Sequence, residues 1–175
     1  MRSITGTILY LDLATNTGWC AGEPGVKVPQ FGHHTLPSTG DNIGRFACEY
    51  EDWFGWLLDE KQPALVGFEM PILPQKTQLS TVRKLTGLAY DTERQCRRRA
   101  IRCVEGRAST VKKFFVGSGK AEKADTMHMC RRYGWRVTTD DEADACAGWA
   151  YLISCYAPEH AGMFNMGPLA AGRAA

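Results

Sequence analysis

Four acidic residues crowd the stretch TTDDEADACAGWAYL, residues 138–152, which has the pattern of a helix. These acids are Asp140, Asp141, Glu142 and Asp144. Acids are favoured in the first turn of a helix, where they meet the positive end of the helix dipole, and Thr138 or Thr139 would cap this one. Capping does not explain Asp144, because an ionised carboxylate among small and apolar residues is costly unless something pairs with it. Asp141 and Asp144 are three residues apart and share a helix face, so half of a metal site is the alternative.

Two further acids end segments that have the pattern of β-strands. Asp12 ends the apolar run at 8–12, and the turn residues and second apolar run that follow predict a hairpin. Glu69 ends the short apolar run at 64–69. An acid after a strand is more often a turn residue than a ligand, but strand ends at one sheet edge can meet a helix packed across them. Carboxylates gathered in this way suit Mg²⁺, and two such ions can support the attack of water on a phosphodiester.

Basic residues are concentrated in the middle of the chain, although the net charge is only +2. Residues 1–75 contain four Lys or Arg and nine Asp or Glu, residues 76–136 contain sixteen and five, and residues 137–175 contain one and five. A basic block of this density suits a polyanion, of which nucleic acid is the commonest. A solvated helix face is the alternative. Together with the carboxylates, the block favours a metal-dependent nuclease.

Length and composition predict one ordinary globular domain, because the chain has 175 residues of which 44% are hydrophobic. No apolar run is long enough to span a membrane, and the first residues lack the features of a signal peptide. We therefore expect no membrane association and a cytoplasmic location. The seven cysteines have no zinc-type spacing, so reduced thiols, mostly in the core, are expected.

The hydrophobic periodicity predicts an α/β domain with a mixed sheet at residues 1–156 and a loosely ordered tail at residues 157–175. The strands expected after the hairpin lie at 26–36, 64–69 and 101–106. The expected helices lie at 41–60 and 76–100 and within 108–117, 118–134 and 138–152.

Four longer motifs occur in one order along the chain: YLDLATNTGW, VGFEMP, STVKKFFVGSGKAEKADTMHM and DDEADACAGWAYL. In this order they resemble the RuvC-type Holliday junction resolvases of the ribonuclease H-like superfamily, and the small phage and prophage-borne branch is the most similar. The resemblance covers about residues 8–156. It implies a five-stranded mixed sheet flanked by helices, a homodimer, and Mg²⁺-dependent cleavage of two opposed strands of a four-way DNA junction. Two ions are implied, and Mn²⁺ would be able to substitute.

The resemblance also implies the residues of the site. Four catalytic metal ligands match the family's motifs on two strands and the last helix: Asp12, Glu69, Asp141 and Asp144. Asp140 and Glu142 have no match and keep the capping role. Lysines of the VKK and AEKA motifs contact DNA near the scissile phosphate in the family. The DNA-binding candidates here are Lys112 and Lys123, with Lys113 and Lys120 beside them.

The loop after the glutamate departs from the family's pattern. Cellular members carry an aromatic residue there that helps to open the junction, whereas this loop reads MPILPQ. An aliphatic wedge can still unstack bases, so Met70 and Ile72 are added to the DNA-binding candidates. The first strand also ends in DLATNTGW where cellular members usually have a D-P-G-type turn. Both departures leave a broader activity on branched DNA open.

A cluster of arginines lies at the end of the long helix, which the resemblance implies is the dimer contact. Its members are Arg94, Arg97, Arg98, Arg99 and Arg102. We expect part of this cluster to face DNA and part to pair with acids at the dimer contact. Trp135, near the basic helix, is a candidate for stacking on a base.

The sequence as a whole predicts a metal-dependent, structure-selective endonuclease that resolves Holliday junctions and other branched DNA. Another ribonuclease H-like nuclease, one that cuts RNA in hybrids or lacks junction preference, is the alternative within enzymes. A junction-binding protein without activity is the alternative from another class, because a fold can persist when its ligands bind metal poorly.

Overall fold

The computed structural model describes residues 3–69 and 78–164 of the chain. Each predicted strand and helix is present within these ranges. The strands are β1 (Ile8–Asp12), β2 (Asn16–Gly22), β3 (Gln30–Thr35), β4 (Leu65–Glu69) and β5 (Arg102–Gly106). The α-helices are α1 (Ile43–Lys61), α2 (Leu79–Arg98), α3 (Ala108–Val116), α4 (Lys123–Arg132) and α5 (Asp140–Tyr156).

The strands form one five-stranded mixed sheet, as predicted. Their order is β3-β2-β1-β4-β5. The neighbours β1, β2 and β3 are antiparallel, which confirms the predicted hairpin, whereas β4 pairs in parallel with both β1 and β5. Parallel neighbours need a crossover connection, and α2 provides the one from β4 to β5.

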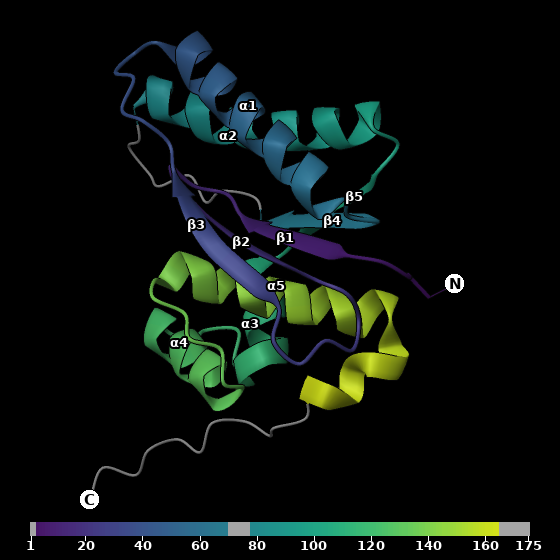
Figure 1. The fold of residues 1–175 in the computed structure, drawn as a ribbon. Coiled ribbons are helices and arrows are strands. Elements are labelled where there is room, and N and C mark those ends of the chain that lie inside the picture. The colour runs from purple at the N-terminus through teal and green to yellow at the C-terminus, as the bar shows by residue number, and fades with distance from the viewer. Residues whose placement is uncertain (1–2, 70–77, 165–175) are drawn as a thin grey trace, which may run out of the picture.

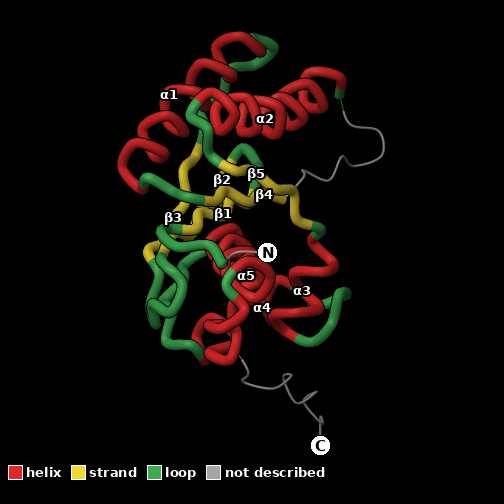
Figure 2. The backbone as a smooth tube through the Cα atoms, turned by 90° about the vertical axis from the view of Figure 1, so that its right-hand side faces the viewer, coloured by secondary structure: helices red, strands yellow, loops and turns green. Residues whose placement is uncertain are grey.

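Helices cover both faces of the sheet. Figures 1 and 2 show α1 and α2 on one face, and α5 with α3 and α4 on the other. Successive side chains of a strand point to opposite faces, and the central strand β1 follows this rule. Leu9 and Leu11 lie in the core beneath α1 and α2, whereas Ile8 and Tyr10 lie in the core shared with α5. Asp12 therefore projects toward the α5 side.

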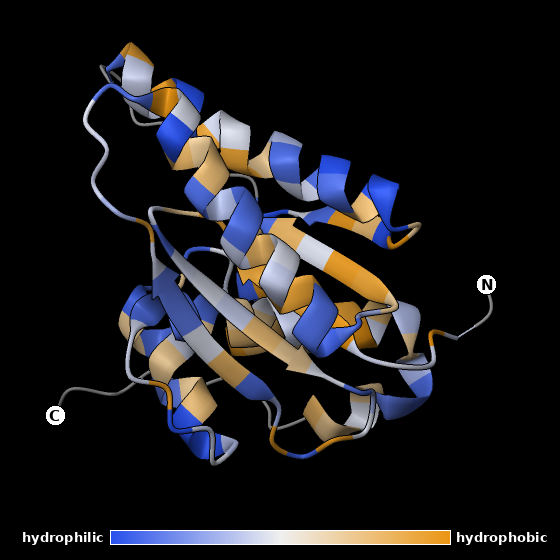
Figure 3. Cartoon of the chain, turned by 45° about the horizontal axis from the view of Figure 1, so that its top comes forward, coloured by the Kyte–Doolittle hydropathy of each residue, from blue (hydrophilic) through white to orange (hydrophobic). Residues whose placement is uncertain are grey.

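The predicted amphipathic pattern places α1 on the sheet. Its buried side chains are Phe46, Tyr50, Phe54, Leu57 and Leu58. Figure 3 shows hydrophilic and hydrophobic residues following one another along its turns. Burying each large apolar side chain contributes about 1.5 to 3 kcal/mol, so this face holds α1 in place. Asn42 caps the helix by accepting a hydrogen bond from the Arg45 N–H at 2.9 Å.

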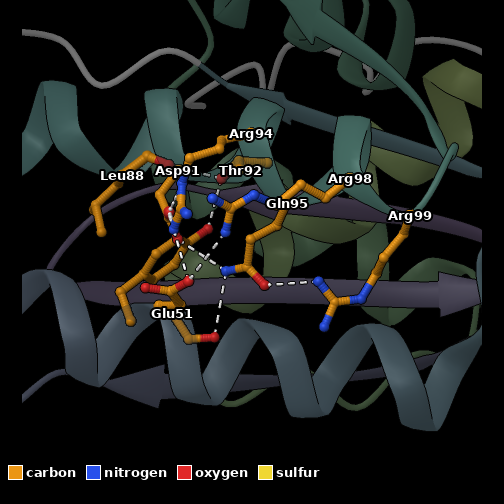
Figure 4. A network of polar contacts seen from close by, with 9 residues as sticks. Glu51, Leu88, Asp91, Thr92, Arg94, Gln95, Arg98 and Arg99 are labelled. Carbon is orange, nitrogen blue, oxygen red and sulfur yellow. Dashed lines mark hydrogen bonds and ion pairs between the residues drawn. The ribbon is translucent and has the colours of Figure 1, made fainter.

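A polar network joins α2 to α1 (Figure 4). Asp91 is mostly buried and accepts hydrogen bonds from Gln95 Nε2 and Arg94 Nε, each at 2.8 Å. The Arg94 guanidinium also pairs with Glu51 of α1 at 2.8 Å. Asp91 therefore has charged and neutral donors around it, so that its burial is compensated.

The described chain ends in a short 3-10 helix, Pro158–Phe164, and the rest of the predicted tail, residues 165–175, lies outside the described residues. The Phe164 ring packs edge-on against Trp135, with ring centroids 6.4 Å apart. Trp135 is only 1% exposed and donates its Nε1–H to the Lys27 carbonyl at 2.9 Å. The prediction that Trp135 stacks on a base is therefore wrong, because its ring belongs to the core.

All seven cysteines are free thiols, and four of them are buried, as expected. None of the helices described is both long enough and apolar enough to cross a membrane.

Candidate active site

One aligned row of residues crosses the whole sheet. The strand pairing places His33, Gly18, Asp12, Glu69 and Gly106 side by side on β3, β2, β1, β4 and β5. Because β1 and β4 are parallel, their carboxyl ends meet at one edge, and Asp12 and Glu69 become direct neighbours. The structure thus brings together the two acids that end the apolar strands.

The start of α5 lies against this row. A Cβ atom at Gly18 would overlap the carbonyl oxygen of Asp141, so the helix reaches β2 only because this position is glycine. Thr139 caps α5 by accepting a hydrogen bond from the Glu142 N–H at 3.2 Å. Asp141 and Asp144 follow within the first turns of the helix, and their charges act on Asp12 across the interface.

Glu142 does more than the capping role predicted for it. It is only 6% exposed, and its carboxylate accepts hydrogen bonds from the Thr138 N–H at 2.6 Å and the Thr138 hydroxyl at 3.0 Å. It also contacts His33 Nδ1 at 2.9 Å. Burial raises the pKa of Glu142, but these hydrogen bonds outweigh burial and hold the pKa below its ordinary value. The contact fastens the start of α5 to β3.

Asp141 points toward β2. Its carboxylate accepts a hydrogen bond from the Asn16 side-chain amide, and the Asn16 amide oxygen accepts one from the Thr35 hydroxyl at 2.5 Å. Sequence reasoning missed both partners, because Asn16 reads as an ordinary turn residue. Their only signal is the pairing of β2 with β3, which places Asn16 opposite Thr35.

Asp144 is largely buried and incompletely paired. Its side chain is 15% exposed, and the Lys112 ammonium lies 3.9 Å from Oδ2. The Thr126 hydroxyl is near enough to lower the pKa of Asp144 slightly. Within the described residues, however, neither Asp144 Oδ1 nor Thr126 Oγ1 makes a hydrogen bond, although both atoms are buried. A buried carboxylate oxygen without a donor is an unusual cost for a folded protein.

Burial and the charges of neighbouring acids raise the pKa values of Asp12, Glu69 and Asp144. For Asp12, burial and then the charges of Asp144, Glu69 and Asp141 hold the pKa well above its usual range. For Glu69, burial and then Asp144 raise the pKa to about 7, although Lys112 opposes the change. Burial also raises the pKa of Asp144. The charges of Glu69, Asp141 and Asp144 thus act on Asp12, and that of Asp144 acts on Glu69.

Hard oxygen donors of this kind suit a divalent cation such as Mg²⁺. Across residues 3–69 and 78–164, no three His, Cys, Asp or Glu side chains converge tightly enough to hold an ion as they stand. Repulsion between acids gives a physical reason for this spread. The donor set and the unpartnered oxygen of Asp144 are chemically suited to a cation.

Two lysines border the carboxylates. Lys112 of α3 lies beside Asp144, and Lys123 at the start of α4 forms an ion pair with Asp140. This pair lowers the pKa of Asp140 and raises that of Lys123. Lys113 and Lys120 are exposed. The remaining DNA-binding candidates, Met70 and Ile72, lie outside the described residues.

Three of the clustered arginines pair with acids of their own chain. Arg94 and Arg98 contact Glu51 at 2.8 and 3.9 Å, and Arg99 contacts Asp59 at 3.6 Å. The side chain of Arg102 lies over the Tyr156 ring, 4.6 Å from its centroid. The acids that these arginines contact within the chain are Glu51 and Asp59 of α1 and, for Arg94, also Asp91 of α2.

Tyr10 is a buried residue of the site that sequence reasoning missed. Its ring occupies space left by Gly67, Gly106 and Gly148, where a Cβ atom would collide with it. The hydroxyl is buried and has no hydrogen-bond partner in the part of the chain that the structure describes. Burial and the charges of nearby carboxylates, first that of Glu69, raise the pKa of Tyr10. The sequence of an apolar strand does not show that its tyrosine will be buried beside the acids of the site.

Comparison with known proteins finds a match in fold but none in sequence. No protein-family model matches the chain, and a search of curated proteins finds no match. Solved structures do match. RuvC of T. thermophilus in complex with a Holliday junction substrate superposes with a TM-score of 0.70 at 14% identity, covering 87% of this chain and 94% of that one. The chain has the fold of the RuvC resolvases.

Two further structures support the RuvC fold. A second Thermus thermophilus RuvC structure gives a TM-score of 0.65 at 14% identity, over 85% of this chain and 96% of that one. The yeast mitochondrial Holliday junction resolvase Ydc2 gives 0.66 at 12% identity, over 93% of this chain and 84% of that one. The RuvC fold therefore spans nearly the whole described chain.

Proposed function

We propose that the protein is a Mg²⁺-dependent, structure-selective DNA endonuclease that resolves Holliday junctions and other branched DNA. One observation carries this proposal. In a RuvC fold, Asp12 and Glu69 are neighbours at one sheet edge, the charges of Asp141 and Asp144 on α5 act on Asp12, and a buried oxygen of Asp144 has no partner among the described residues. A cation bound there would reduce the repulsion between the acids and would give the unpaired oxygen a partner. One structural neighbour was solved with a Holliday junction, which supports this choice of substrate.

The proposed metal ligands are Asp12, Glu69, Asp141 and Asp144. They would hold two Mg²⁺ ions, for which Mn²⁺ would substitute, and bound ions would favour deprotonation of the attacking water and offset charge on the phosphate. The role of the four carboxylates is to supply negative charge and to keep the ligand oxygens aligned. A reaction on DNA agrees with the cytoplasmic location predicted from the sequence.

The proposed phosphate contacts come from the lysines that border the acids. Lys112 already lies at the edge of the site, 3.9 Å from Asp144. Lys123 is paired with Asp140, and its side chain is 66% exposed. An exposed ion pair contributes only about 0 to 1 kcal/mol, so a phosphate can replace Asp140 at small cost. Lys113 and Lys120 would extend this basic border.

We also propose a homodimer formed through α2. Leu79 and Tyr90 are 73% and 69% exposed. Being eleven residues apart, they lie on one side of the helix. A two-fold axis through this side would pair the same surface of both copies and supply one site for each of two opposed strands. Light scattering tests the dimer, and a strict monomer would contradict it.

The decisive experiment offers the purified protein three labelled substrates in Mg²⁺: a synthetic four-way junction, a linear duplex of the same sequence, and an RNA–DNA hybrid. We expect paired cuts in the junction and little cleavage of the duplex. Asp144→Asn should bind the junction with an affinity close to that of the wild type and leave it uncut.

The other outcomes decide between the remaining readings. Cleavage of the hybrid with intact junctions would overturn junction resolution in favour of another ribonuclease H-like nuclease. Binding without cleavage by the wild type, in Mn²⁺ as well as Mg²⁺, would leave a junction-binding protein.

A further inference from the structure

We infer that Asn16 and Thr35 are positioning residues that hold the Asp141 carboxylate in place for a metal ion, an inference that rests on the proposed function. Asn16 and Thr35 face each other across β2 and β3, two residues beyond the aligned pair Gly18 and His33. Side chains two residues apart on a strand share a face. Both side chains therefore lie on the side of the sheet that α5 covers.

Two hydrogen bonds in series link Thr35 to Asp141. The Thr35 hydroxyl donates to the Asn16 amide oxygen at 2.5 Å, and the Asn16 amide nitrogen donates to Asp141 Oδ2. An ionised carboxylate can only accept hydrogen bonds, whereas an amide has one accepting and one donating end. Because Thr35 engages the accepting end, the donating end is directed at Asp141. The hydroxyl thus fixes which way the amide is turned.

The backbone makes this link rigid. At Gly18 the chain of β2 lies against the start of α5, where a side chain would collide with the Asp141 carbonyl. His33 and Glu142 add a second tie between β3 and α5 at 2.9 Å. Asn16 and Asp141 consequently have little freedom to separate, and the amide holds one carboxylate oxygen, Oδ2, without engaging Oδ1.

Asp141 and Asp144 differ in this respect. Asp141 is fixed by an uncharged donor, whereas a buried oxygen of Asp144 has no hydrogen bond among the described residues. A ligand that is fixed beforehand loses less side-chain freedom when it binds a cation. Groups that orient metal ligands in this way typically change metal affinity by about 10-fold to 100-fold when removed.

The test is calorimetric titration of the DNA-free, full-length protein with Mn²⁺, alongside cleavage rates measured over a range of Mg²⁺ concentrations. We expect Asn16→Ala to weaken Mn²⁺ binding about 10-fold or more. It should raise the Mg²⁺ concentration for half-maximal rate by a similar factor, while the rate at saturating Mg²⁺ falls much less. Thr35→Val should show a smaller effect in the same direction, and Thr35→Ser, which keeps the hydroxyl, should restore the affinity.

Asn42→Ala is the matched control, because Asn42 caps α1 on the opposite face of the sheet. It should lower the unfolding temperature without changing Mn²⁺ affinity, which separates positioning from general destabilisation. If Asn16→Ala fails to fold, Thr35→Val and Thr35→Ser decide the question alone.

Two results overturn the inference while leaving the proposed function intact. One is wild-type affinity for Mn²⁺ in both Asn16→Ala and Thr35→Val; the other is equal loss of affinity in Thr35→Ser and Thr35→Val. A wild-type protein that binds no Mn²⁺ and cuts no DNA would instead overturn the proposed function, and the inference with it.

Discussion

Asp91 and Asp144 are both largely removed from water, but on opposite faces of the sheet and in different surroundings. Their side chains are 11% and 15% exposed. Between α1 and α2, Asp91 accepts hydrogen bonds from Arg94 and Gln95 at 2.8 Å. On the other face, Asp144 has a lysine no nearer than 3.9 Å, and its Oδ1 has no donor within the described residues.

The difference separates a carboxylate that stabilises the fold from one kept for a ligand. Asp91 belongs to a network in which acids and arginines alternate, so its charge is compensated in the folded chain. Asp144 instead lies near Asp12 and Glu69, and its charge raises the pKa values of both. Buried polar groups that remain unsatisfied, combined with shifted pKa values, are typical of functional sites.

The largest expected effect comes from Asp144→Asn. It removes a proposed metal ligand, so we expect junction cleavage in Mg²⁺ to fall on the order of 100-fold or more. It also removes a poorly compensated charge, so the unfolding temperature in EDTA should stay the same or rise. Cleavage kinetics and thermal unfolding measure the two quantities. A variant that loses stability as well as activity would remove the contrast with Asp91.

Asp91→Asn should show the reverse behaviour. The substitution leaves Arg94 without its buried partner, and we expect a loss of about 2 to 3 kcal/mol in the free energy of unfolding. Cleavage at a temperature well below the transition should change less than about 2-fold, since Asp91 lies on the face away from the acids. Urea unfolding with cleavage assays checks both. A stable but inactive variant would show that the network serves the site.

The acid-rich face also predicts how stability depends on pH. A carboxyl whose pKa is raised by folding adds stability below its unfolded pKa, and this is lost as pH rises through the folded pKa. For Glu69 that interval runs from 4.5 to about 7, and Asp12 and Asp144 act in the same direction.

In EDTA we therefore expect the unfolding temperature to fall between about pH 4.5 and pH 7, and saturating Mg²⁺ to cancel most of the fall. Glu69→Gln should flatten the metal-free profile. A level profile for the metal-free wild type would contradict the proposed repulsion.

The smallest expected effect distinguishes two buried tyrosines. The Tyr50 hydroxyl donates to Thr92 Oγ1 at 2.7 Å, because the Thr92 hydroxyl itself donates to the Leu88 carbonyl. Tyr50→Phe should therefore cost about 1 kcal/mol. Tyr10→Phe removes a hydroxyl that has no described partner, so stability should change by less than about 0.5 kcal/mol or rise slightly. Equal losses in chemical unfolding would show that Tyr10 does have a partner.

The sequence predicted the elements well because each has a strong local pattern. Apolar runs that end in Asp12 and Glu69 predicted two buried strands, and the structure makes these strands parallel neighbours. The spacing of Asp141 and Asp144 predicted a shared helix face. Local patterns of this kind depend on residues close in sequence, which is why they can be recognised without the fold.

Local patterns could not predict the contacts between distant segments. Asn16 and Asp141 are 125 residues apart, and His33 and Glu142 are 109 apart. Each contact depends on the register of β2 and β3 and on how closely α5 approaches Gly18. The ion pair between Lys123 and Asp140 is of the same kind, since it needs α4 to begin beside α5. Trp135 was misjudged because burial depends on packing and not on neighbouring charge.

The slot around Tyr10 has a consequence for how this sequence can vary. A side chain at Gly67 would meet Leu152 first, but the Tyr10 side chain alone fills the volume beside Gly106 and Gly148, so three positions on β1, β5 and α5 share one space. None of them can grow while Tyr10 stays large. Among divergent homologues, a small residue at position 10 should therefore accompany larger residues at positions 106 and 148, and the three should change together.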